Sequence, residues 1–212
     1  MSKILILNGS IRGIHGNSWA ICNIAKNYLE TEHSKEVTIL NLSDYMPSIK
    51  EVYNIIDDHD GFIIISGTYW NNFGSPLQRF IEVVTPLENS SHFFGKPVAC
   101  AVTMDSVGGM DVAARVHSVF SGLGCWSPPC STLVISRIAH EAVIASNEGN
   151  EDVWSLDDIK IVLTNLVVAT TIKNKSWVSW SNVNLKLSDG EWPETGDLNL
   201  KTPVFIKCNL TK

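Results

Sequence analysis

Residues 3–17 read KILILNGSIRGIHGN, and this stretch decides the fold. Residues 3–8 form a near-continuous apolar run, which is typical of a parallel strand buried on both faces. Residues 9–17 contain three glycines, a serine and an arginine, and a helical pattern begins at Ser18. Glycines let a backbone turn its N–H groups inward, and the N-terminus of a helix attracts negative charge. The stretch therefore predicts a strand, a phosphate-binding turn and a helix.

Strand and helix patterns alternate along the rest of the chain. Apolar runs indicate strands, and apolar residues spaced by three and four indicate helices. Ser48 suits a helix cap, and Ser75 is expected to cap another helix in which Pro76 takes the first position. The predicted strands cover 3–8, 37–42, 61–66, 96–103 and 132–136, and the predicted helices cover 18–32, 48–57, 75–84, 109–124 and 155–170. Five strands in strict alternation with five helices predict an α/β fold with a doubly wound parallel sheet.

Composition narrows the class of protein. The chain has 212 residues, 44% of them hydrophobic and 18% charged, which indicates one compact domain. A net charge of −6 without a basic stripe argues against nucleic acid as a partner. The apolar runs are too short for a membrane span, and the first residues enter a strand with no cleavage site for a signal peptide. We therefore expect a cytoplasmic protein with no membrane partner.

Neither the cysteines nor the acidic clusters predict a metal or disulfide site. The five cysteines are widely spaced, and the closest two, Cys125 and Cys130, have no histidine nearby. They are therefore interpreted as unrelated thiols. Residues 57–60 read DDHD and resemble a metal cluster in composition. They precede a strand and so lie at the amino end of the sheet. Ligands of open α/β sheets bind at the opposite, carboxyl end, so a solvated turn is expected here.

The pattern changes in the last forty residues, and we divide the chain into a domain at 1–172 and an extension at 173–212. Leucines, valines and tryptophans there alternate with polar residues, which predicts a β-like arm. We expect Trp177, Trp180 and Trp192 to cover the domain or a second subunit, with the mouth of the active site as an alternative place.

In an open α/β sheet, ligands bind outside the carboxyl ends of the strands. Three loops meet there in the predicted fold. The first supplies hydroxyl, amide and guanidinium donors for a phosphate. The second, residues 67–76, carries three aromatic side chains and suits a flat heterocycle, although local packing is the alternative. The third, residues 104–109, is a glycine-bearing turn of a common kind. The candidate ligand-binding residues are Ser10, Arg12, Asn17 and Ser18 in the first loop, Thr68, Tyr69, Trp70 and Asn71 in the second, and Ser106, Gly108 and Gly109 in the third.

Other phosphate-binding motifs do not match. Gly9, Gly13 and Gly16 are spaced G-x3-G-x2-G, which disfavours the dinucleotide fingerprint G-x-G-x-x-G. The loop lacks the G-K-[ST] ending of a nucleotide-hydrolysing P-loop, and the chain has no Tyr-x3-Lys. It also lacks His-Glu-x-x-His and Gly-x-Ser-x-Gly, which weakens zinc protease and α/β-hydrolase interpretations.

Together the three loops resemble those of the flavodoxin-like NAD(P)H-dependent FMN reductase and quinone reductase family, over roughly residues 3–172. The matching residues are Gly9, Ser10, Arg12, Asn17 and Ser18 in the first loop, Tyr69, Ser75 and Pro76 in the second, and Ser106, Gly108 and Gly109 in the third. Two positions depart from the family pattern, because Gly67 replaces a proline and Gln78 occupies the usual lysine position.

The resemblance implies a flavodoxin-like sheet of order 2-1-3-4-5 with helices on both faces. It implies noncovalent FMN, with the phosphate on the four candidates of the first loop and the ring against residues 68–71 and the turn at 106–109. NADPH or NADH would be the co-substrate, and a small molecule such as a quinone, flavin, azo compound or metal ion the electron acceptor. A homodimer or homotetramer is expected from family habit. Because the flavin performs the chemistry, no side chain is nominated as catalytic.

Two alternatives remain open at this point. One is a flavodoxin-like electron-transfer protein that serves protein partners. The other is that the departures at Gly67 and Gln78 mark a family member that binds flavin weakly or serves as a structural or regulatory subunit.

Overall fold

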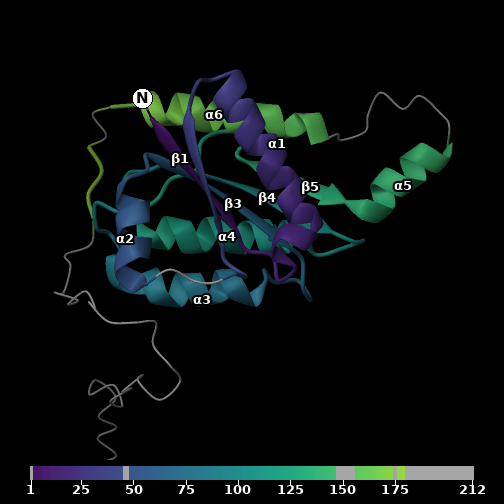
Figure 1. The fold of residues 1–212 in the computed structure, drawn as a ribbon, viewed down its shortest axis with the longest axis horizontal. Coiled ribbons are helices and arrows are strands. Elements are labelled where there is room, and N and C mark those ends of the chain that lie inside the picture. The colour runs from purple at the N-terminus through teal and green to yellow at the C-terminus, as the bar shows by residue number, and fades with distance from the viewer. Residues whose placement is uncertain (1, 45–47, 147–155, 174–175, 180–212) are drawn as a thin grey trace, which may run out of the picture.

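The computed structural model describes residues 2–44, 48–146, 156–173 and 176–179. A five-stranded sheet of order β2-β1-β3-β4-β5 forms its centre, and every strand pair is parallel. The strands are β1 (Lys3–Asn8), β2 (Glu36–Asn41), β3 (Gly61–Gly67), β4 (Val98–Met104) and β5 (Thr132–Ser136), and the helices are α1 (Asn17–Thr31), α2 (Ile49–Asp57), α3 (Ser75–Val84), α4 (Gly109–Leu123), α5 (Arg137–Ser146) and α6 (Ile159–Thr171). Helices cover both faces of the sheet (Figure 1), which confirms the predicted flavodoxin-like architecture.

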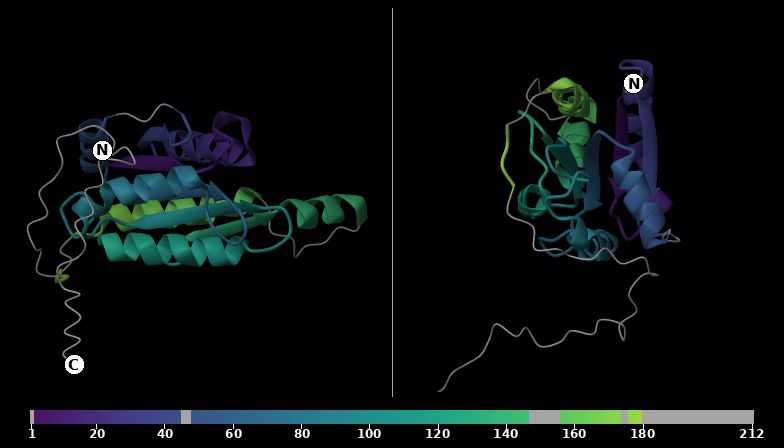
Figure 2. Two further views of the ribbon diagram at one scale, coloured as in Figure 1. Left: turned by 90° about the horizontal axis from the view of Figure 1, so that it is seen from below. Right: turned by 90° about the vertical axis from the view of Figure 1, so that its left-hand side faces the viewer.

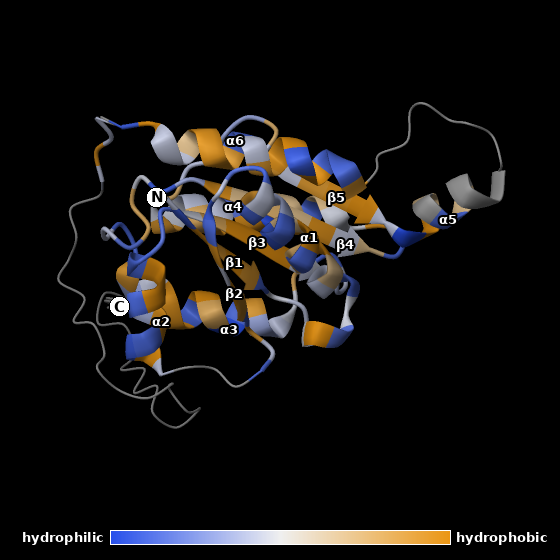
Figure 3. Cartoon of the chain, turned by 45° about the horizontal axis from the view of Figure 1, so that its top comes forward, coloured by the Kyte–Doolittle hydropathy of each residue, from blue (hydrophilic) through white to orange (hydrophobic). Residues whose placement is uncertain are grey.

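Two hydrophobic cores lie on opposite faces of the sheet, because successive side chains of a strand point in opposite directions. Leu5 and Leu7 pack with α2, α3 and α4, whereas Ile4 and Ile6 pack with α1 and α6. Figure 3 shows the hydrophobic central strands between the helices. All seven residues of β3 are buried. This double burial explains why the central strands are continuously apolar in sequence.

Local signals place most helix ends near the predicted residues. Ser48 caps α2 and forms a capping box with Glu51, as a serine before a helix suggests. Gly124 ends α4 with a φ of 111°, a left-handed conformation that glycine adopts at low cost. The expectation that Ser75 caps α3 is wrong, because Gly74 is the N-cap residue and Pro76 lies within the first two helical positions. Proline at either position sacrifices no helical hydrogen bond, so the serine is not needed as a cap.

Helix α5 was not predicted. It follows β5 without an intervening loop and runs outward from the carboxyl end of that strand (Figures 1 and 2). Residues 137–139, 141 and 142 of this helix are exposed, so these positions give no pattern of burial from which the helix could be predicted. The predicted last helix begins instead as a 3-10 turn, η3 (Leu156–Asp158), which leads into α6, and Ser155 lies outside the described residues.

Most of the predicted arm at 173–212 lies outside the described residues, including Trp180 and Trp192. Residues 176–179 are described and form no strand. The ring of Trp177 lies edge-on to that of Trp126, with 5.4 Å between the centroids. Trp126 forms a β-bridge with Pro97, just before β4 begins. Trp177 therefore packs at the amino end of the sheet, away from the expected crevice, and the division of the chain at residue 172 stays a prediction.

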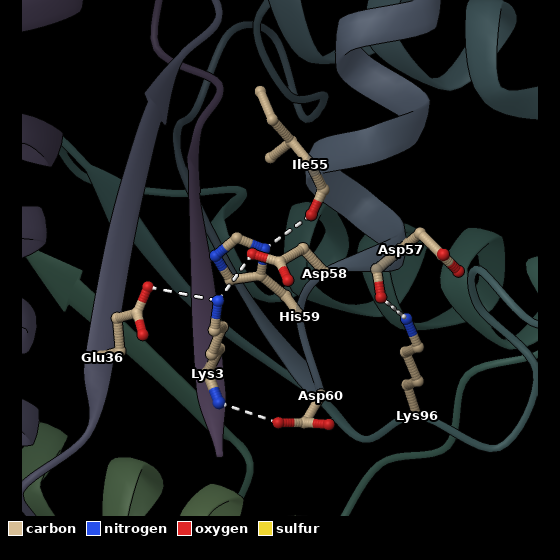
Figure 4. A network of polar contacts seen from close by, with 8 residues as sticks. All are labelled: Lys3, Glu36, Ile55, Asp57, Asp58, His59, Asp60 and Lys96. Atoms are coloured by element: carbon tan, nitrogen blue, oxygen red, sulfur yellow. Dashed lines mark hydrogen bonds and ion pairs between the residues drawn. The ribbon is translucent and has the colours of Figure 1, made fainter. Parts of the chain in front are cut away.

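The DDHD segment, residues 57–60, joins α2 to β3 at the same amino end (Figure 4). Asp58 accepts a hydrogen bond from Lys3 Nζ at 2.8 Å, and Asp60 accepts one from the backbone N–H of Lys3 at 2.8 Å. The expectation of a solvated turn is wrong for His59, which is only 4% exposed and donates through Nδ1 to the Ile55 carbonyl. The carboxylates of Asp58 and Asp60 face solvent, and their hydrogen bonds to Lys3 hold the first residue of β1 in place. Among the described residues no group of three metal-binding side chains occurs.

Within the described part of the chain, the four cysteines are free thiols, and no helix is long and apolar enough to cross a membrane. Burial raises the pKa values of Cys22 and Cys100 to about 12, so both thiols stay protonated at neutral pH. Cys125 is buried and Cys130 exposed, in agreement with their interpretation as unrelated thiols.

We expect a loss of stability below neutral pH that depends on His117 of α4. Its Nδ1 lies 2.6 Å from Ser127 Oγ and its Nε2 lies 2.7 Å from Thr132 Oγ1. Burial lowers the pKa of His117 below its ordinary value. The unfolded chain therefore binds this proton more readily, so the contribution is complete above about pH 6.5 and is lost as the pH falls.

Urea unfolding of the wild type and of His117→Gln at several values between pH 7 and pH 5 measures this effect. The free energy of unfolding should fall more steeply toward pH 5 in the wild type than in the variant. Equal slopes in the two proteins would contradict the assignment.

Candidate functional site

A cavity of about 290 Å³ opens where β1, β3 and β4 end. The chain runs from β1 outward to β2 and then returns to β3 on the other side, so the cavity lies at the point where the strand order reverses. Ligands of open α/β sheets bind at such switch points. The lining residues are Ser10, Arg12, Gly16, Asn17, Ser18, Gly67, Thr68, Tyr69, Thr103, Met104 and Asp105.

The structure brings together all four candidates of the first loop and two of the second. Ser10, Arg12, Asn17, Ser18, Thr68 and Tyr69 line the cavity. The remaining candidates, Trp70, Asn71, Ser106, Gly108 and Gly109, do not line it. Trp70 is fully exposed on a tight turn, and a Cβ at Gly108 would clash with Asn71 Oδ1. The second and third loops therefore touch each other beside the cavity.

Sequence reasoning missed Thr103, Met104 and Asp105, which form the floor and wall contributed by the end of β4. The strand was predicted to end at residue 103, and the ligand was assigned to the glycines that follow. Gly109 instead provides space for packing, since a Cβ there would lie 2.5 Å from Val134 Cγ1. Position at the carboxyl end of a buried strand was the signal that could have identified these residues.

Asn8 shapes the first loop from beneath, although it does not line the cavity. Its side chain is fully buried at the end of β1. The amide donates to the Gly13 carbonyl at 3.3 Å and to Asn41 Oδ1 at 2.9 Å, and Asn8 Oδ1 accepts from the Ser10 N–H at 3.3 Å. A polar residue at the end of a run of apolar residues was its sequence signal. These bonds hold the turn in one shape before any ligand arrives.

Gly13 adopts a left-handed backbone conformation that this turn requires. Its φ is +51°, in the left-handed region, and a Cβ there would clash with Ser43 Oγ. A side chain at this position is therefore disfavoured both by backbone strain and by space.

The N-terminus of α1 lies at the end of the first loop. Its N-cap residue is Gly16, and no side chain caps the helix. The first N–H groups of this fifteen-residue helix are therefore available to an anion, which the helix dipole favours. Ser18 Oγ lies 3.3 Å from Thr103 Oγ1, so the hydroxyl of the first helical turn is held against β4. Such an arrangement can bind an anion.

Two residues of the loop after β3, Thr68 and Tyr69, line the cavity and carry hydroxyl groups. Tyr69 Oη lies 3.4 Å from Ser10 Oγ, so the phenol joins the donors of the first loop. Thr68 Oγ1 is buried and finds no hydrogen-bond partner among the residues that the structure describes. A buried hydroxyl without a partner costs free energy unless a ligand or water satisfies it. Both groups suit a ligand that carries a phosphate and neighbouring hydroxyl groups.

Arg12 is the one cationic side chain among the lining residues, and Asp105 is the one carboxylate. Asp105 Oδ1 accepts from Arg137 Nε at 2.9 Å, and Arg137 Nη1 donates to Glu141 at 3.1 Å. The hydrogen bond with Asp105, followed by the charge of Glu141, raises the pKa of Arg137. The ion pair balances the Asp105 charge, so Arg12 can attract an anion to the opposite part of the cavity.

Of the two positions that depart from the family pattern, one lines the cavity and the other does not. Gln78 lies on the exposed side of α3 and donates to Glu82 at 2.8 Å, and it does not line the cavity. Gly67 does line it, and a Cβ there would lie 3.4 Å from the Tyr69 ring, which is ordinary contact. The replacement of lysine by Gln78 thus leaves the cavity lining unchanged.

Comparisons with known proteins agree with this geometry. The model of the NADPH-dependent FMN reductase family matches residues 2–140. A search of curated protein sequences found no match.

Similar solved structures share the fold at low sequence identity. RosB, described with bound 8-demethyl-8-formylriboflavin-5′-phosphate, is 12% identical, with a TM-score of 0.65 over 92% of this chain and 100% of that one. The apo form of the NADH:FMN oxidoreductase EmoB is 12% identical, with a TM-score of 0.61 over 80% and 89%. The NAD(P)H:acceptor oxidoreductase FerB of Paracoccus denitrificans is 15% identical, with a TM-score of 0.53 over 80% and 96%. At these identities the likeness shows the fold.

Proposed function

The chain belongs to the NADPH-dependent FMN reductase family and is therefore an FMN-dependent NAD(P)H oxidoreductase, and we propose that it passes electrons to a small-molecule acceptor such as a quinone, a flavin, an azo compound or a metal ion. The observation that carries the proposal is the cavity at the switch point, which joins an uncapped helix N-terminus to a buried hydroxyl without a partner. These features suit the phosphate and the hydroxyl-bearing chain of FMN.

In this proposal the first loop holds the phosphate. Ser10, Asn17 and Ser18 donate hydrogen bonds, Arg12 supplies charge, and the N–H groups at the start of α1 complete the site. The hydroxyls of Thr68 and Tyr69 bind the adjoining part of the ligand. Bound FMN supplies the chemistry of hydride and electron transfer.

The loops beside the cavity are proposed to contact the ring. Trp70 and Asn71 extend from one side, and the turn that contains Ser106, Gly108 and Gly109 offers backbone N–H groups from the other. We assign no side chain as a general acid or base. Asp105 is paired with Arg137 and balances charge at this edge.

We also propose a homodimer or homotetramer in the cytoplasm, with NADPH or NADH as the co-substrate. Ile161, Val168 and Ile172 are exposed on or just after α6 and could pack against a second copy. The free thiols support a reducing compartment.

Visible absorbance spectra of the full chain with added FMN, recorded before and after anaerobic NADPH, test the proposal. We expect retained flavin whose visible bands bleach promptly on addition of NADPH. Flavin that binds and ignores both NADPH and NADH would favour the alternative of an electron carrier that serves protein partners. Failure to retain flavin would overturn the proposal.

Replacement of Arg12 by alanine should weaken FMN binding about 10- to 100-fold, because a charge-assisted hydrogen bond contributes about 1.5–3 kcal/mol. Fluorescence titration of FMN measures the dissociation constant. Arg115→Ala, which removes an exposed guanidinium on α4, is the control and should leave the constant unchanged. Equal affinities of Arg12→Ala and wild type would show that the phosphate lies elsewhere.

A further inference from the structure

A serine and a histidine form a hydrogen-bonded pair at the edge of the sheet, outside the cavity assigned to FMN. Ser127 lies in the loop before β5, and His117 lies on α4. Ser127 Oγ is 2.6 Å from His117 Nδ1, and His117 Nε2 is 2.7 Å from Thr132 Oγ1. Thr132 is the first residue of β5, so the pair lies near the amino end of this strand, whereas the cavity lies at the carboxyl ends. The proposed function does not use this pair.

The geometry of the pair is that of a nucleophile beside a base. In such sites a hydroxyl lies about 2.6–3.2 Å from the base, and a third group orients the base. Here Ser127 supplies the hydroxyl, His117 is the base and Thr132 is the third group. When the Thr132 hydroxyl accepts the Nε2–H, Nδ1 carries no proton and accepts the hydroxyl of Ser127. The hydrogen bonds then run in one direction, from Ser127 to His117 and from His117 to Thr132.

His117 is neutral at neutral pH, as a base must be. Burial lowers its pKa below the ordinary value. The side chains of Ser127 and Thr132, which contact the ring, are uncharged. Thr132 in turn forms a hydrogen bond with Cys100, whose thiol stays protonated because burial raises its pKa to about 12. The imidazole therefore keeps a lone pair for the Ser127 proton throughout the neutral range.

The loop holds Ser127 in place and leaves it accessible. On one side, the backbone N–H of Trp126 donates to the Lys96 carbonyl at 3.1 Å. On the other side, the Pro129 carbonyl accepts from Asn165 Nδ2 at 2.9 Å. Two prolines follow Ser127 directly, and each fixes its own φ. Ser127 is exposed, so a molecule in solution can reach its hydroxyl.

A second contact between a serine and a histidine differs in one respect. Ser90 Oγ lies 3.0 Å from His92 Nδ1, but it donates to the Leu87 carbonyl at 2.6 Å. A hydroxyl has one proton, so Ser90 accepts from His92 and cannot give its proton to that ring. Among the described residues, the Ser127 hydroxyl hydrogen-bonds to His117 alone. Its proton is therefore available to the base.

We propose that Ser127 is a nucleophile that takes the acyl group of an activated ester, with His117 as its general base. Ser127 Oγ forms a bond to the carbonyl carbon, and the bond between that carbon and the leaving oxygen breaks. The leaving group keeps the electron pair and departs as an anion, while the hydroxyl proton passes to His117 Nδ1 and then to water. An activated ester suits the site, because its leaving group needs no proton donor.

The probe is 4-nitrophenyl acetate, whose leaving group departs as a coloured anion. Added to the full chain, it should place one acetyl group on Ser127, while Ser90 in the same sample stays unmodified. Tandem mass spectrometry locates the acetyl group and separates it from acetyl groups on lysines or on the exposed Cys130.

The pH dependence of this acetylation reports on the base. The rate at Ser127 should rise to about pH 6.5 and then level off, because it follows the neutral form of His117. A hydroxyl without a base should instead react about tenfold faster with each added pH unit, since hydroxide then removes its proton.

Variants assign the roles of the two residues. His117→Gln should slow acetylation of Ser127 at least about 100-fold, the lower end of the range for general-base catalysis. Ser127→Ala should remove the acetyl group from this loop. Ser121→Ala, which removes an exposed hydroxyl from α4, is the control and should leave the rate at Ser127 unchanged. Circular dichroism verifies that each variant is folded.

No acetyl group on Ser127, equal acetylation of Ser90, or a rate that keeps rising about tenfold per unit above pH 6.5 would each overturn the inference. A His117→Gln protein that reacts as fast as the wild type would do the same. The pH profile is measured on the wild type, so it decides the question even where the variant does not fold. None of these measurements involves FMN, so they leave the proposed function untouched.

Discussion

Replacement of Gly74 by alanine is expected to weaken FMN binding about 10- to 100-fold, because a displaced turn loses a charge-assisted hydrogen bond to the phosphate worth about 1.5–3 kcal/mol. A Cβ at this position would lie 2.5 Å from the Gly9 carbonyl oxygen and 3.3 Å from both Ile11 and Tyr69. The φ of Gly74 is −65°, so the cost comes from space and not from backbone strain. The oxygen belongs to the backbone and cannot move unless the whole turn after β1 moves, together with Ser10.

Fluorescence titration of FMN into purified Gly74→Ala measures this effect. Gly122→Ala is the matched control, because nothing lies within 4 Å of a Cβ at that position of α4. The control should keep its affinity for FMN and gain about 0.5–1 kcal/mol of stability, since alanine suits a helix interior better than glycine. A Gly74→Ala protein with the affinity of the control would show that the close approach of these two loops does not position the phosphate site.

Replacement of Phe93 by alanine should lower the free energy of unfolding by about 3–5 kcal/mol, the range for removing a buried aromatic ring. Phe93 is fully buried in the core that faces α2, α3 and α4. Its ring centroid lies 5.5 Å from that of Phe62 and 6.2 Å from that of Phe120. The variant loses both ring contacts and leaves a cavity beside the sheet.

Urea denaturation gives the free energy of unfolding for this comparison. Ile138→Ala, which truncates an exposed apolar side chain on α5, is the control and should change stability by no more than about 0.5 kcal/mol. Phe93 precedes β4 at the end of the sheet away from the cavity, so FMN affinity should be unchanged where the variant is folded. A loss below about 1 kcal/mol would mean that the core closes around the missing ring.

Local sequence signals determined the fold of this protein. Strands β1 and β5 begin and end where the apolar runs predict, and the bounds of β3 differ from the prediction by one residue. Parallel strands covered on both faces must be apolar at every position, so their extent can be read directly from the chain. The turn after β1 and the helix that follows it were also predicted correctly, because the glycines and the start of the helix are consecutive in sequence.

The residues that line the cavity could be predicted only in part from the sequence. Ser10 and Ser18 belong to one local motif and were found, whereas Thr103 and Asp105 join the cavity only because β4 lies beside β3 in the sheet. Asn8 was missed for the same reason, since its partner Asn41 is 33 residues away. The local pattern marks such residues only by their position at the end of an apolar run, and it does not reveal their distant partners.

Sequence alone therefore determined the alternation of strands and helices and the position of the glycine-rich turn between β1 and α1, because both depend on neighbouring residues and on the periodicity of burial. Tertiary structure alone decided which side chains of the three loops reach the cavity, that His59 is buried, and that α5 runs outward to bring Arg137 to Asp105. Those outcomes depend on which strands become neighbours and on how closely their loops approach, and this is settled when the sheet packs.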